Sequence, residues 1–234
     1  IVNIIIENGI IKDIKKTILP SEKETDTICD IKENIIIPGL IDTHVHLRDP
    51  GMTQKETWTT GTQAAAHGGY TTIIDMPNTL PATDTKKAFQ EKRNIATKTS
   101  YVDFGLHAGV ITRKDVMDIM SEKPASYKIF MDLYTNKQLD EMFNYVSQTN
   151  KPLSLHCEDK TLVDYNIKTM KKNPLNKNKT ITYSYARSAL AELIAVNRAI
   201  ELAKKYKLQL HLCHISTRQT LELIHEAKEK LNIS

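Results

Sequence analysis

The 234-residue sequence predicts an α/β fold in which short strands alternate with helices. Apolar, often β-branched runs indicate six strands, at 35–47, 70–76, 101–110, 126–131, 152–156 and 208–214. Stretches with helical spacing of apolar residues lie between and after them, at 57–67, 85–98, 113–121, 136–149, 185–205 and 217–230. This alternation is typical of parallel βα units. About six such units are present, and a TIM-type (β/α)8 barrel needs eight.

Two regions of different character divide the chain. Residues 1–34 contain the apolar run Ile4-Ile5-Ile6 followed by the turn sequence Glu7-Asn8-Gly9, which indicates a small, partial β subdomain. Residues 35–234 carry the barrel pattern and are expected to form a C-terminally incomplete barrel domain. The lysine- and asparagine-rich segment 171–179 is expected to be a solvated loop.

Composition excludes several classes of protein. The net charge of +4 comes from lysines scattered among acids, with no aromatic-interleaved stripe, so we expect no nucleic-acid partner. No apolar run is long enough for a membrane span and no secretory leader opens the chain, which favours a cytoplasmic protein. Cys29, Cys157 and Cys213 are widely spaced, as reduced thiols would be. Cys157 follows His156 and Cys213 precedes His214, two histidines considered below as site residues. Neighbouring residues on a strand point to opposite faces, so we expect both cysteines to point away from that site as small buried hydrophobic residues.

The segment 44–51 is the strongest functional signal. It follows the apolar run 35–41 and begins with His44 and His46. Residues at i and i+2 of a strand point to the same face, so both imidazoles can reach one metal ion. The alternative is a pair of polar residues that merely end a strand.

Two further histidines end predicted strands. His156 shares a strand face with Ser154, and His214, at the end of the strand expected at 208–214, shares one with Leu210 and Leu212. Active sites of α/β barrels lie at the carboxyl ends of the strands. We therefore expect both histidines at the same site as the first pair.

Lys128 lies in the middle of an otherwise apolar strand. A buried ammonium without a partner is costly, so one interpretation requires an acid beside it. The other is that burial favours the neutral amine, which can capture carbon dioxide. The resulting carbamate has two oxygens that can bridge two cations. The residues alone leave both interpretations open.

The remaining histidines are weaker candidates. His67 ends a helix and His225 lies within one, so both are expected at the surface. His211 has the opposite strand parity from His214 and is expected to face the helices. His107, in phase with Gly105, is placed where it could reach the mouth of the barrel.

Several segments together resemble the dihydroorotases of the amidohydrolase superfamily. The resemblance extends from about residue 35 to the end of the chain and is carried by 44–51 with 75–79, by 127–131, by 156–159 and by 211–214. Related hydantoinases and allantoinases lack the combination of Arg48 and Asn78. In the family these two side chains bind the substrate carboxylate, which suits an arginine because its fork donates two parallel hydrogen bonds.

The resemblance implies an activity and its cofactors. The reaction is the reversible cyclisation of N-carbamoyl-L-aspartate to L-dihydroorotate in pyrimidine biosynthesis, by a metal-activated water. Two zinc ions are implied, with these ligands: His44 and His46 for one, His156 and His214 for the other, and carboxylated Lys128 between them. The family's proton-transferring aspartate is expected beyond Ser234, so none of these residues is expected to transfer a proton, and the 234 residues alone are expected to be inactive.

Alternative functions remain at this point. The chain could be an allantoinase- or hydantoinase-type cyclic amidohydrolase, or a non-catalytic dihydroorotase-like partner protein. The resemblance implies a small-molecule substrate, and it raises a homodimer and aspartate transcarbamoylase as candidate associations.

Overall fold

The computed structural model describes residues 2–17, 27–172 and 180–234, and the chain divides into two compact units, Ile1–Pro38 and Gly39–Ser234. In the small unit, β1 (Asn3–Glu7) and β2 (Ile10–Lys15) form an antiparallel hairpin. Asn8 and Gly9 join them with φ values of 53° and 76°. Asparagine and glycine tolerate this left-handed conformation best, so the predicted turn is confirmed.

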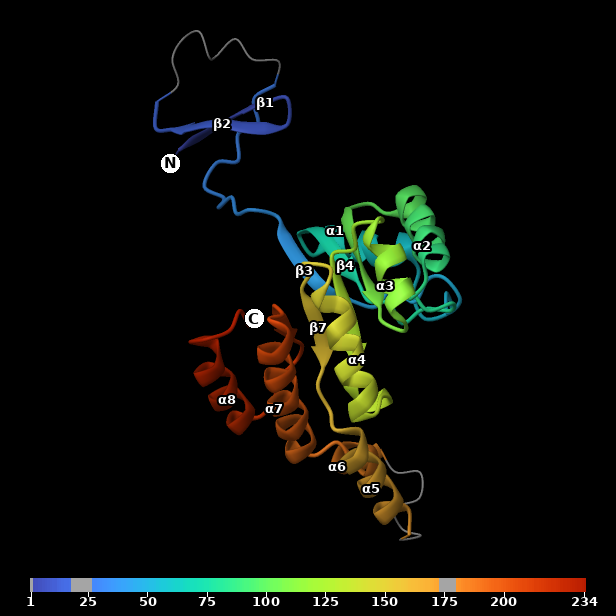
Figure 1. The fold of residues 1–234 in the computed structure, drawn as a ribbon. Helices are drawn as coiled ribbons and strands as arrows, with labels where there is room; N and C mark the ends of the chain where they lie inside the picture. The colour runs from blue at the N-terminus through green and yellow to red at the C-terminus, as the bar shows by residue number, and fades with distance from the viewer. Residues whose placement is uncertain (1, 18–26, 173–179) are drawn as a thin grey trace. The chain divides into compact units, whose positions relative to one another are not determined.

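The large unit, coloured from light blue to red in Figure 1, contains a six-stranded parallel sheet. Its strands are neighbours in space in the same order as in the sequence. The sheet curls as part of a barrel, and its strands are β3 (Leu40–Val45), β4 (Tyr70–Asp75), β5 (Asp103–Gly109), β6 (Ser126–Phe130), β7 (Leu153–His156) and β8 (Leu210–Leu212). Ser234 extends the ladder beyond β8, since its N–H donates to Leu210 O at 3.0 Å and its carbonyl accepts from Leu212 N at 2.8 Å. The predicted α/β partial barrel is confirmed.

Helices connect the strands in the described part of the chain. Four begin at a threonine whose side chain accepts a backbone N–H of the first turn, at Thr57, Thr85, Thr112 and Thr135. The helices are α1 (Trp58–His67), α2 (Lys86–Thr99), α3 (Arg113–Met120), α4 (Asn136–Ser147), α5 (Lys160–Lys171), α6 (Thr180–Ala186), α7 (Ala189–Tyr206) and α8 (Arg218–Lys228), with a 3-10 turn, η2, at Met131–Leu133.

Several element predictions needed correction. The first strand begins at Leu40 rather than at residue 35, because Pro38 has no N–H to donate to a ladder. The expected helix 185–205 is two helices that meet at Arg187 and Ser188. Helix α5 was not predicted, and of the expected loop 171–179 only residues 171 and 172 are described, the first inside α5 and the second as its C-cap.

The two faces of β6 determine where the site lies. The hydroxyl of Tyr127 donates to Val116 O on α3 at 2.6 Å, so this side chain and its strand-face partner Ile129 pack under the helices. Lys128 therefore points to the inner face of the curled sheet. Ser154 on β7 is its register partner and shares that face.

Candidate metal centre

His44 and His46 lie side by side at the end of β3. Their ring centroids are 5.3 Å apart. The backbone N–H of His44 donates to Asp42 Oδ1 at 2.9 Å, and the ring atom Nδ1 of His46 lies 2.8 Å from Asn78 Oδ1. An amide oxygen can only accept, so His46 carries its proton on Nδ1 and leaves Nε2 free to bind a metal.

Lys128 is buried on the inner face, with 2% of its surface exposed. Its Nζ lies 3.0 Å from Cys213 Sγ and 5.1 Å from the centre of the Phe130 ring. Among the described residues no carboxylate forms an ion pair with it. The acid required by the first interpretation of this lysine is therefore not found among the described residues. The expectation that Cys213 points away from the site was wrong, because the strand ends at Leu212 and its alternation ends there too.

His214 reaches the site by a route that strand alternation did not predict. Its φ of 41° is left-handed, and it lies two residues beyond the end of β8. Within β8, His211 is the register partner of Ser154 and faces inward, so the prediction that it faces the helices was wrong. Leu212 pairs with Leu155 on the opposite face. The left-handed turn brings His214 Nε2 to 3.3 Å from His156 Nδ1.

The four histidines form a continuous row of rings. The ring centroids of His44 and His214 are 5.2 Å apart, and those of His156 and His214 are 4.9 Å apart. Burial is the main cause that lowers the pKa of His44 to about 3, and burial also lowers the pKa values of His46 and His214. These imidazoles are therefore neutral at physiological pH, which metal binding requires.

The donor set fits zinc. Two nitrogens each about 2.05 Å from a tetrahedral zinc ion lie about 3.3 Å apart. His156 Nδ1 and His214 Nε2 are 3.3 Å apart, which is a hydrogen-bond distance and also a spacing that two ligands of one tetrahedral zinc ion can have. Imidazoles are preferred zinc ligands, and the row of four supplies two pairs.

Arg48 and Asn78 lie together beside this row. Arg48 has a left-handed φ of 62°, and its Nη1 lies 3.4 Å from the main-chain oxygen of Asn78. In the described chain no carboxylate pairs with Arg48, so the Nε and Nη2 side of its guanidinium is available to an anion. The side-chain nitrogen of Asn78 is available as well, since only the oxygen bonds to His46.

The other histidines lie elsewhere. His67 and His225 are exposed, as predicted. His107 is the register partner of Ser126, whereas Lys128 pairs with Gly109. His107 therefore lies two residues further from the carboxyl ends of the strands than Lys128 and does not reach the mouth of the barrel. Its Nδ1 lies 2.6 Å from Ser126 Oγ, and its Nε2 donates to Thr43 O at 2.9 Å. Burial lowers its pKa to about 4.

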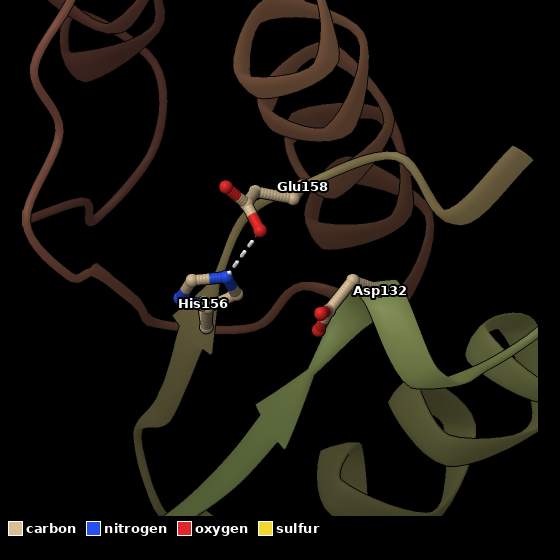
Figure 2. A group of neighbouring side chains, drawn as sticks. All are labelled: Asp132, His156 and Glu158. Atoms are coloured by element: carbon tan, nitrogen blue, oxygen red, sulfur yellow. Dashed lines mark hydrogen bonds and ion pairs between the residues drawn. The ribbon is translucent and has the colours of Figure 1, made fainter. Parts of the chain in front are cut away.

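Charged partners of the site were missed by the sequence reasoning. Glu158 Oε2 accepts from His156 Nε2 at 2.9 Å, and Asp132 lies next to the pair (Figure 2). Arg187 forms ion pairs with both carboxylates. Their positions in the sequence could have indicated both carboxylates. Glu158 lies two residues after the candidate ligand His156, and Asp132 lies two residues after the end of β6.

Comparison with known proteins identifies the family. A model of the family described as Dihydro-orotase-like matches residues 33–220. The chain belongs to this family. It is 98% identical over 234 residues to a dihydroorotase of Methanosphaera stadtmanae, covering all of this chain and 54% of that protein. It is 37% identical over 230 residues to one of Methanothermobacter thermautotrophicus, covering 97% and 52%.

Solved structures support the same barrel. An L-hydantoinase (dihydropyrimidinase) from Arthrobacter aurescens superposes with a TM-score of 0.89 at 26% identity, over 99% of this chain and 53% of that one. A D-hydantoinase from Bacillus sp. AR9 superposes with a TM-score of 0.85 at 26% identity, over 99% and 52%. The chain thus spans about half the length of the relatives it matches. In its described part, no helix is both long and apolar enough to cross a membrane.

Proposed function

We propose that the natural polypeptide containing these residues is a dihydroorotase, which interconverts N-carbamoyl-L-aspartate and L-dihydroorotate. The observation that carries the proposal is the row of four histidine rings, joined by contacts of 5.3, 5.2 and 4.9 Å, beside the buried Lys128. The relatives described above bear the name of this activity.

The proposed cofactor is a pair of zinc ions. His44 and His46 would hold one ion and His156 and His214 the other, with a carbamate on Lys128 between them. Bound zinc would activate water and polarise the amide carbonyl of the ring. The support for the carbamate is a buried amine that has no carboxylate partner among the described residues. The proton-transferring aspartate is proposed to come from outside residues 1–234.

Arg48 and Asn78 are proposed to bind the substrate carboxylate. The guanidinium would donate two parallel hydrogen bonds and the Asn78 side-chain nitrogen a third. The oxygen of the same amide would keep the proton of His46 on Nδ1. Asn78 would thereby connect substrate recognition to a metal ligand.

A second candidate function is hydrolysis of a neutral cyclic amide, because the superposed structures are hydantoinases. The available fork of Arg48 favours an anionic substrate instead. The polypeptide is further proposed to act in the cytoplasm. A homodimer and an aspartate transcarbamoylase complex stay predictions that light scattering and co-purification test.

The test is an assay of the zinc-loaded natural polypeptide on dihydroorotate, hydantoin and allantoin. We expect ring opening of dihydroorotate alone, and loss of both activity and one zinc ion in His214→Ala. His225→Ala changes an exposed histidine and should leave both unchanged. Preference for hydantoin or allantoin, or full activity of His214→Ala, would reject the proposal.

A further inference from the structure

Glu158 is shared between a proposed metal ligand and an arginine. Its Oε2 accepts from His156 Nε2 and from Arg187 Nε, each at 2.9 Å. Figure 2 shows the Glu158 side chain directed at the His156 ring, with Asp132 nearby in η2, the turn that follows β6. The His156 ring thus has one nitrogen bonded to a carboxylate and the other facing His214.

Arg187 is itself held on three sides. Besides Glu158, its Nη2 contacts Asp132 Oδ2 at 3.1 Å, and its guanidinium lies 4.3 Å from the centre of the Tyr183 ring. Its side chain is 22% exposed, and those of Glu158 and Asp132 are 15% and 13% exposed. A guanidinium fixed in this way loses little further freedom when it orients a carboxylate.

The same atoms could be interpreted as a separate metal site. Ligand atoms of Asp132, His156 and Glu158 lie within 4.8 Å of one another. However, the guanidinium of Arg187 already forms ion pairs with both carboxylates. Its positive charge would repel a metal cation bound at the same place. The arrangement is therefore better explained as an ion-pair network around His156.

We propose that Glu158, held by Arg187, is a positioning residue for His156. It keeps the proton on Nε2 and presents Nδ1 as the metal-binding atom. Carboxylates that accept the second N–H of a ligating histidine fix its tautomer and ring orientation, and losing one typically costs about 10- to 100-fold in metal affinity or activity. The inference rests on the proposed function, in which His156 binds zinc.

The experiment measures zinc affinity by competition with a chelator, using the natural polypeptide that contains these residues. In Glu158→Met we expect one zinc to bind about 10- to 100-fold more weakly, while the other is unchanged. Arg187→Met should weaken the same zinc less. Because Arg187 acts through Glu158, the double variant should be no weaker than Glu158→Met alone. Glu201→Met is the matched control, since it removes an exposed glutamate with a surface lysine partner.

A second readout keeps the test informative if Glu158→Met folds poorly. Nitrogen NMR of the metal-free protein, with the signal assigned by loss in His156→Asn, should show the proton of His156 on Nε2 in the wild type. In Glu158→Gln, which keeps the shape but loses the charge, the population on Nδ1 should rise. Unchanged zinc affinity and tautomer in the Glu158 variants would overturn the positioning role. A wild-type protein that binds no zinc would instead overturn the proposed function.

Discussion

Lys92 and Asp75 form an ion pair in which both side chains are completely buried. The ammonium lies 2.5 Å from Asp75 Oδ2 and donates to Met76 O at 2.7 Å, while Asp75 Oδ1 accepts from Leu47 N at 2.7 Å. The pair therefore connects α2 to two segments of the site. One follows β3 and carries His46, and the other follows β4 and carries Asn78.

Removing one partner of such a pair should be strongly destabilising. Lys92→Met keeps most of the side-chain volume but leaves Asp75 buried without its counter-charge, which typically costs about 3–5 kcal/mol. The double variant Lys92→Met/Asp75→Asn removes both charges and should recover a large part of that loss. Urea unfolding of the wild type, both single variants and the double variant measures the four free energies.

A control on the same helix separates burial from charge. Lys87 is 87% exposed and lies 3.9 Å from Glu91, an i,i+4 surface pair. Lys87→Met should cost about 0.5 kcal/mol or less. If Lys92→Met were no more destabilising than Lys87→Met, or if the double variant were worse than the sum of the single variants, the reasoning about the buried pair would be refuted.

Three further predictions concern recognition and pH. Arg48→Lys should lower kcat/KM for dihydroorotate about 10- to 100-fold with zinc content unchanged, because an ammonium cannot reproduce the fork; wild-type kinetics would contradict this. Asn78→Asp keeps an acceptor for His46 but removes the amide donor and adds charge, so KM should rise while both zinc ions stay bound; a lost zinc ion would count against it. Burial lowers the pKa of His107 from 6.5 to about 4, so the unfolded chain binds the extra proton and stability falls by about 3 kcal/mol as pH drops through that interval. Urea unfolding of the metal-free protein against pH should show a shallower fall in His107→Gln, and identical slopes would exclude His107 as the cause.

Local patterns in the sequence were sufficient for most of the barrel. The strand expected at 126–131 is β6, and the helix expected at 85–98 is α2, because an apolar run and a helical repeat are both local properties. Helix α5 was missed although its apolar residues Leu162, Val163, Ile167 and Met170 have helical spacing. Of its residues only Val163 is buried, so the helix contributes little to the core.

Strand alternation predicted the residue types of the site better than their directions. It holds within β7, where His156 and Ser154 share a face. It fails at His214, which lies beyond the last strand and reaches the site through a left-handed turn. Pairs such as Lys92 with Asp75 or Arg187 with Glu158 depend on contacts between separate elements, and no local pattern in the sequence indicates them.

For His46 and His156, the nitrogen that stays free is determined by the hydrogen-bond partner of the other ring nitrogen. Asn78 accepts a hydrogen bond from Nδ1 of His46 and leaves Nε2 free, whereas Glu158 accepts one from Nε2 of His156 and leaves Nδ1 free. The two rings therefore present opposite nitrogens to the same row of side chains. A sequence that places four histidines at strand ends specifies a candidate metal centre. In the proposed site, Asn78 and Glu158 would then decide which nitrogen His46 and His156 offer to a metal ion.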